Sequence, residues 1–91
     1  MKIPFTIEDA KVALALKMGR VVTKEGYAVE ILDWNFIKEE KYEHFKIQGK
    51  CIGFTACWNE DGKFYIHSEN SSNYISVPRL DLEIEIYDDS P

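Results

Sequence analysis

The chain is poor in several residue types on which other small proteins depend. Its 91 residues include only two cysteines, Cys51 and Cys57, which could close a single short loop, so a disulfide framework is excluded. No apolar run approaches the ~20 residues of a membrane-spanning helix, and the N-terminus lacks the apolar core of a signal peptide. We therefore expect one domain over residues 1–91, in the reducing cytoplasm, with both thiols free.

Positive charge is also scarce. Lysine and arginine total 11 against 16 acidic residues, and the only arginines are Arg20 and Arg79. Because binding to a phosphate backbone needs clustered basic side chains, we expect no nucleic-acid partner. The chain also lacks a glycine-rich phosphate loop, a Gly-x-Ser-x-Gly elbow and a His-Glu-x-x-His pair. These absences predict a protein that is not an enzyme and uses no cofactor.

The two cysteines and the two histidines, His44 and His67, match in number the ligands of a zinc site. If Cys51 and Cys57 lie on one strand, however, their sulfurs are about 20 Å apart at ~3.3 Å per residue, beyond the reach of one metal ion. A turn at Gly53 would shorten that distance. Free cysteines usually serve as small buried apolar side chains. We therefore predict no metal site and no catalytic thiol.

The chain is rich in apolar residues, at 45%, and their spacing first predicts a helix over residues 6–18. Thr6 and Asp9 form a capping-box pattern at its start, and Gly19 is expected to end it in a left-handed conformation. An apolar stripe at helical spacing is expected to cover a sheet; its members are Ile7, Ala10, Ala13, Leu14, Leu16 and Met18.

After Gly19 the apolar period changes to two, which predicts an antiparallel sheet over residues 20–87. Glycine-containing turns predict hairpins at 24–26 and 59–62, the first returning over 27–34 and the second joining strands over 51–58 and 63–67. Residues 35–43 are expected to form a long loop or a fraying turn of helix, and residues 68–73 a loop. A short strand over 74–77 is expected to stop at Pro78, and residues 80–87 alternate most regularly as a final strand.

These elements predict an α+β fold in which one N-terminal helix packs on a strongly curved antiparallel sheet of five to six strands. Gly49 and Gly53 are possible kink points, which favours an SH3-like half-barrel plugged by the helix. A flat sheet covered by one helix is the alternative.

The net charge of −5 comes from the C-terminal end, where Asp81, Glu83 and Glu85 alternate along the final strand and Asp88 and Asp89 follow it. We interpret the three strand residues as a solvated acidic face that protects an edge strand from pairing with other chains. The alternative is an acidic mimic that binds a basic partner.

Aromatic residues are more numerous than one small core needs. Trp34 and Trp58 lie beside predicted loops or turns, and Tyr65 and His67 lie on the face of their strand opposite Phe64 and Ile66. Lids over the core are the first interpretation. The second is a ligand pocket or an interface. A second apolar face would be buried most simply against another copy of the chain.

Several turn and core positions resemble those of a family of short uncharacterised proteins, with a domain of unknown function, from gut bacteria, phages and mobile elements. The matching segments are Ile3-Pro4-Phe5, Gly19-x-Val21-Val22-Thr23-x-x-Gly26 with Val29 and Ile31-Leu32 following, Asp61-Gly62-Lys63 and Leu80-Asp81-Leu82. The resemblance implies no catalytic residues.

We predict a non-enzymatic interaction module that associates with itself or with another protein. The alternative, suggested by a phage origin, is a sponge that sequesters a small anionic nucleotide signal. In that case Arg20, Arg79, Lys24 and His67 would contact the anion, and Trp34, Trp58 or Tyr65 would stack on the base.

Overall fold

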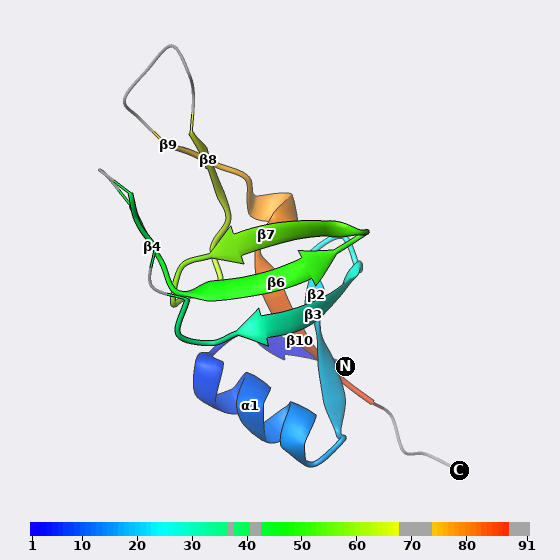
Figure 1. Cartoon of the computed structure of the whole chain (residues 1–91). Helices are drawn as coiled ribbons and strands as arrows, with labels where there is room; N and C mark the ends of the chain where they lie inside the picture. Colours follow the sequence, from blue (N-terminus) through cyan, green and yellow to red (C-terminus); the bar gives the residue numbers. More distant parts are fainter. Residues whose placement is uncertain (37, 41–42, 68–73, 88–91) are drawn as a thin grey trace.

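The computed structural model shows an α+β fold in which one N-terminal helix packs on a six-stranded antiparallel sheet (Figure 1). It describes residues 1–36, 38–40, 43–67 and 74–87. In chain order its elements are β1 (Lys2–Pro4), α1 (Ile7–Ala15), β2 (Gly19–Thr23), β3 (Ala28–Asp33), β4 (Lys38–Glu40), β5 (Glu43–Phe45), β6 (Ile47–Cys51), β7 (Phe54–Trp58), β8 (Tyr65–His67), β9 (Tyr74–Ser76), the 3-10 helix η1 (Pro78–Leu80) and β10 (Leu82–Ile86). No helix among the described residues is both long and apolar enough to cross a membrane.

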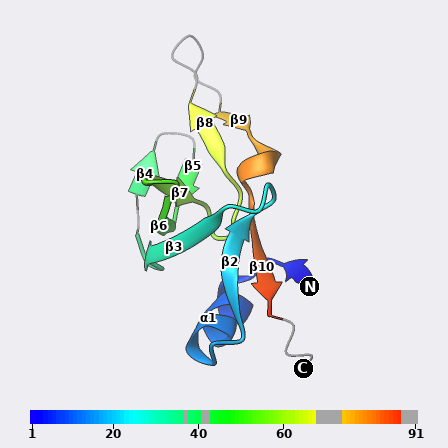
Figure 2. The same cartoon turned by 90° about the vertical axis from the view of Figure 1, so that its right-hand side faces the viewer.

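The main sheet has the strand order β1-β10-β2-β3-β6-β7 and is open, because its end strands β1 and β7 do not pair with each other. Strands β2 and β3 pair only at Val21 with Val29 and at Val22 with Ala28. Beyond that short contact β3, β6 and β7 run across the direction of β2 and β10 (Figure 1). The predicted half-barrel is therefore wrong: β4 pairs with β5, and β8 with β9, in two separate ribbons (Figure 2), so these strands do not close the sheet.

Helix α1 begins as predicted but covers the sheet with smaller side chains than expected. The Thr6 hydroxyl accepts a hydrogen bond from the Asp9 N–H at 3.0 Å, which confirms the N-terminal cap. Ala10 and Ala13 are buried against the sheet, whereas three larger members of the predicted stripe are 39%, 63% and 46% exposed, namely Leu14, Leu16 and Met18. The stripe is therefore only partly buried, because the two alanines occupy the face that meets β2 and β10.

The helix ends earlier than predicted, and Lys17 rather than Gly19 takes the left-handed conformation, with φ 55°. The Met18 N–H donates to the Ala13 carbonyl and the Lys17 N–H to the Leu14 carbonyl, a pattern that closes a helix. Gly19 instead begins β2, where an added side chain would collide with the backbone of β10.

The hydrophobic core lies between α1 and the main sheet, and both β2 and β10 and the crossing strands β3, β6 and β7 contribute to it. It is built on eight buried residues: Ala10, Ala13, Val21, Val29, Ile47, Trp58, Leu82 and Ile84. Gly49 lets the largest of them pack across β6, since a Cβ there would lie 3.1 Å from Cζ3 of Trp58 and 2.9 Å from Cγ1 of Val29. Gly49 thus permits a close approach of side chains.

Strands β2 and β3 form the predicted hairpin at 24–26. Gly26 has φ 95°, and its N–H donates to the Thr23 carbonyl at 2.8 Å. Along β3, Val29 and Ile31 face the core and Leu32 faces outward, as the alternation predicts.

The predicted single strand over 51–58 is wrong, because the chain reverses within it. Ile52 and Gly53 have φ values of 51° and 78°, a two-residue turn that joins β6 to β7. Cys51 pairs with Phe54 across this hairpin, so both lie on the core face. The reversal moves Cys51 to the face opposite the one that alternation along one strand assigns to it.

The predicted turn at 59–62 is present, with a hydrogen bond of 2.9 Å from the Gly62 N–H to the Asn59 carbonyl, but it does not close a hairpin. The Gly62 carbonyl accepts from the Leu82 N–H, and the Phe64 N–H donates to the Asp81 carboxylate. These bonds carry the chain toward β10, so β8 pairs with β9 and not with β7.

Two further loop predictions have different outcomes. Residues 35–43 were expected to form a loop but contain β4 and the first residue of β5, a two-stranded ribbon. The predicted loop at 68–73, like Asp88 and Asp89, lies outside the described residues. Strand β9 and the break at Pro78, which begins η1, are confirmed.

Candidate functional site

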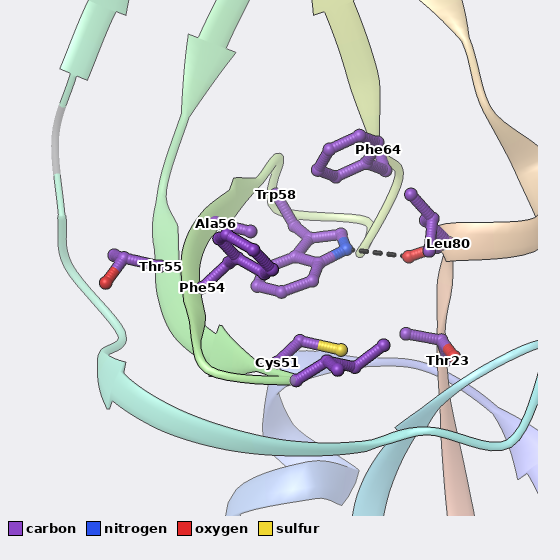
Figure 3. Close-up of a pocket in the computed structure, with 9 residues that line it drawn as sticks. Thr23, Cys51, Phe54, Thr55, Ala56, Trp58, Phe64 and Leu80 are labelled. Carbon is purple, nitrogen blue, oxygen red and sulfur yellow. Dashed lines mark hydrogen bonds between the residues drawn. The ribbon is translucent and has the colours of Figure 1, made fainter.

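An apolar pocket of about 310 Å³ lies beside the β6–β7 hairpin, on its core face. Cys51, Phe54 and Ala56 form its hairpin side, and Thr23 and Leu80 lie across from them (Figure 3). The other elements of the described chain cover this part of the core face only partly, since Phe54 is 75% exposed. The pocket is thus an unfilled extension of the hydrophobic core.

Trp58 forms a fixed wall of this pocket. Its side chain is only 1% exposed, and its indole N–H donates to the Leu80 carbonyl at 2.8 Å (Figure 3). The Phe64 ring packs on it at a centroid distance of 6.0 Å and an interplanar angle of 58°. Packing and the hydrogen bond therefore hold the pocket in shape without a ligand.

The tip of the hairpin exposes two large apolar side chains. Ile52 is 62% exposed and Phe54 is 75% exposed, and both border the pocket. A β-branched residue in the left-handed region is sterically strained, and such strain often occurs at functional sites. We refer to Ile52, Phe54 and the adjoining pocket as the tip surface.

Cys51 contributes a thiol to the pocket, and burial raises the pKa of this thiol above its ordinary value. The group therefore stays protonated at neutral pH, as a small apolar side chain rather than a nucleophile. Cys57 lies on β7 and pairs with Gln48 of β6, and Gln48 is three positions before Cys51. Within the described ranges no group of three His, Cys, Asp or Glu residues is placed to hold a metal ion.

The two arginines proposed as anion contacts lie apart from each other, and Lys24 lies in the β2–β3 turn near Arg79. Arg20 pairs with Glu85 at 2.9 Å near the start of β2, whereas Arg79 lies in η1, 4.0 Å from Glu25. The Glu25 N–H donates to the Arg79 carbonyl, which places Arg79 beside the β2–β3 turn at the far end of β2. Each arginine thus faces a carboxylate, and the length of β2 separates them.

The predicted acidic face is interrupted at both of its ends. Asp81 is 4% exposed; one carboxylate oxygen accepts the Phe64 N–H at 2.9 Å, and the other lies 3.6 Å from Nζ of Lys63. Glu85 is engaged by Arg20. Strand β10 also lies inside the sheet, between β1 and β2, so its acidic residues do not guard an edge.

The remaining candidates are dispersed. Trp34 is half-buried against the core, with Nζ of Lys11 5.7 Å from its ring centroid. Tyr65 is half-buried on β8, where His67 pairs with Tyr74. Of the predicted site residues, the tip surface includes only Trp58.

Cys51, Phe54 and Leu80 line the pocket but were not predicted as binding residues from the sequence. The available signal was Gly53, which occupies the second position of a two-residue turn between apolar residues. The turn was not predicted because a β-branched residue such as Ile52 is unexpected at its first position.

Comparison with known proteins gives no assignment. Family models, curated proteins and solved structures were each searched, and none of them matches this chain. The resemblance to short proteins of phages and gut bacteria stays a prediction, and the function rests on the site itself.

Proposed function

We propose that the protein is a non-enzymatic interaction module that binds its partner through the tip surface. The observation that carries this proposal is Ile52, whose backbone is held at φ 51° while its side chain is 62% exposed. The backbone conformation costs free energy, and the exposed side chain adds little stability in return. A left-handed conformation disfavours a residue other than glycine by about 1–2 kcal/mol, and an exposed isoleucine gains little from burial.

A partner that covers the tip surface explains this arrangement. Ile52 and Phe54 would be removed from water on binding, and the pocket beside them would accept an apolar group. The rigid wall formed by Trp58 lowers the entropy lost on binding, because the site is already ordered.

The nucleotide sponge receives less support from the geometry. Such a site needs cations beside a stacking surface. Arg20 and Arg79 each face a carboxylate at opposite ends of β2, and the Trp58 ring is buried. We therefore favour an apolar partner over an anionic ligand.

Self-association is the second candidate, favoured by the outer side of α1. Val12 and Leu16 are 54% and 63% exposed and lie four residues apart, so they are neighbours on one side of the helix and its C-terminal turn. Two copies could bury these side chains against each other across a two-fold axis.

Binding of the dye 1-anilinonaphthalene-8-sulfonate tests the main proposal. The native protein should enhance its fluorescence, and Phe54→Ser should lose most of that enhancement because it removes the exposed ring beside the pocket. Leu32→Ser is the matched control, since Leu32 is 50% exposed on the outer face of β3. If circular dichroism shows that both proteins are folded and the native protein and Phe54→Ser give equal dye fluorescence, the proposal is wrong.

A further inference from the structure

We propose that the partner is an extended peptide segment that adds to the edge of β7 at Thr55 and places one bulky apolar side chain in the pocket. This inference rests on the proposed role of the tip surface and names the class of partner. It combines two independent features, an edge strand and a pocket, that meet at the same end of the hairpin.

The backbone of β7 is available at this end. In the part of the chain that the structure describes, β7 is the last strand of the main sheet. A two-residue turn makes Cys51 and Phe54 a hydrogen-bonded pair, so the next pair, Lys50 with Thr55, is not hydrogen-bonded across the hairpin. The N–H and C=O of Thr55 therefore point away from β6, toward the open edge.

The available edge is short. Further along β7, Cys57 already has an interaction partner. The open stretch is therefore the part centred on Thr55, next to the tip, and it offers one donor and one acceptor to an added strand.

A strand added at Thr55 would direct its side chains correctly for the pocket. Paired residues of neighbouring strands point to the same face of a sheet. Peptide residues opposite Phe54 and Ala56 would therefore point to the core face, and both of these residues border the pocket. A volume of about 310 Å³ is at the small end of ligand sites, which suits a single bulky side chain.

The exposed area at the tip favours a short segment over a second copy of the chain. An aromatic side chain presents about 150–250 Å², so Phe54, at 75% exposed, offers at most about 190 Å², and Ile52, at 62% exposed, adds the smaller area of one aliphatic side chain. A stable protein pair needs about 800 Å² from each partner. Backbone hydrogen bonds at an edge strand supplement this small apolar contact, as in other cases of strand addition.

The probe for this inference is a labelled peptide in which leucine alternates with threonine between lysine ends, measured by fluorescence anisotropy. The matched peptide has the same composition with its leucines grouped together. A third peptide carries N-methyl groups on the central amides, which removes the donors needed for strand pairing. We expect the alternating peptide to bind and the other two to bind about tenfold more weakly or not at all.

On the protein side, Thr55→Pro removes the outward N–H without breaking a bond to β6, and it should reduce binding of the alternating peptide by a similar factor. Lys2→Pro is the matched control on the opposite edge. Met1 and Ile86 exchange both of their backbone hydrogen bonds, so the neighbouring Lys2 N–H also points outward. Dye binding by Thr55→Pro shows whether its pocket remains intact.

The outcomes separate this inference from the proposed function. Equal affinity for the alternating and N-methylated peptides, or no peptide binding by a protein that binds the dye, overturns strand addition while the tip surface stands. Absence of dye binding overturns the proposed function itself. If the native protein is a dimer and Phe54→Ser dissociates it, the tip surface binds a second copy of the chain, and the inference of a peptide partner is overturned.

Discussion

Asp81 is a buried carboxylate that connects two segments distant in sequence. One of its oxygens accepts the Phe64 N–H at 2.9 Å, and its carbonyl accepts the Lys24 N–H at 3.0 Å. Phe64 in turn packs on Trp58, a wall of the pocket. A single acidic side chain thereby fixes the segment that leads out of the main sheet and one wall of the candidate site.

Asp81→Ala should destabilise the protein by about 1–3 kcal/mol, because it leaves the part-buried Phe64 N–H without its acceptor. Urea denaturation followed by tryptophan fluorescence measures this loss. Glu83→Ala, on the outer face of the same strand, is the control and should change the unfolding free energy by about 0.5 kcal/mol or less. If Asp81→Ala lowers the unfolding free energy no more than Glu83→Ala does, the role of Asp81 in holding the Phe64 segment is contradicted.

At the scale of elements, the β6–β7 hairpin combines strain with exposure. Its turn has the geometry that asparagine followed by glycine prefers, yet isoleucine occupies the first position. In helix α1 the two buried side chains are alanines, Ala10 and Ala13, whereas the larger Val12 and Leu14 are exposed. Both elements therefore present apolar side chains that the described chain does not cover.

Ile52→Asn should stabilise the protein by about 1 kcal/mol, because asparagine tolerates a left-handed conformation better than a β-branched residue does. For a domain of this size that corresponds to a rise in Tm of about 4–8 °C, measured by differential scanning calorimetry. Ile52→Val retains the branched Cβ and should not produce the rise. An unchanged or lower Tm for Ile52→Asn would show that the turn is not strained.

At the scale of the whole molecule, the apolar side chains at the tip and on the outer side of α1 belong to different elements, the β6–β7 hairpin and the helix with its C-terminal turn. The two can therefore be tested separately. Association through α1 would leave the tip free for another partner, and the net charge of −5 opposes nonspecific aggregation.

If copies associate through α1, sedimentation velocity should show a concentration-dependent dimer that Leu16→Glu converts to monomer. A charge at this 63% exposed position would have to be buried in the interface without a partner. Leu32→Glu, on β3, should leave the dimer intact. A native protein that stays monomeric at high concentration removes self-association as a candidate.

The sequence by itself determined the elements whose signals are local. Thr6 and Asp9 define the start of the helix, Gly26 defines the first hairpin, and the alternation along β10 defines its buried face, because each depends on residues a few positions apart. Fold class followed from the change of apolar period at Gly19. The candidate site did not follow, since only Trp58 among its residues was singled out.

Only the tertiary structure decided where the strands pair and which apolar residues stay exposed. A period of two is the same whether a strand pairs with its predecessor or with another strand. Asp81 and Leu82 bind the chain at Phe64 and Gly62 across 17 and 20 positions of sequence, and this directs β8 away from β7. Because β8 does not pair with β7, the core face around Phe54 stays partly uncovered. These hydrogen bonds join residues far apart in the sequence, so no local pattern predicts them.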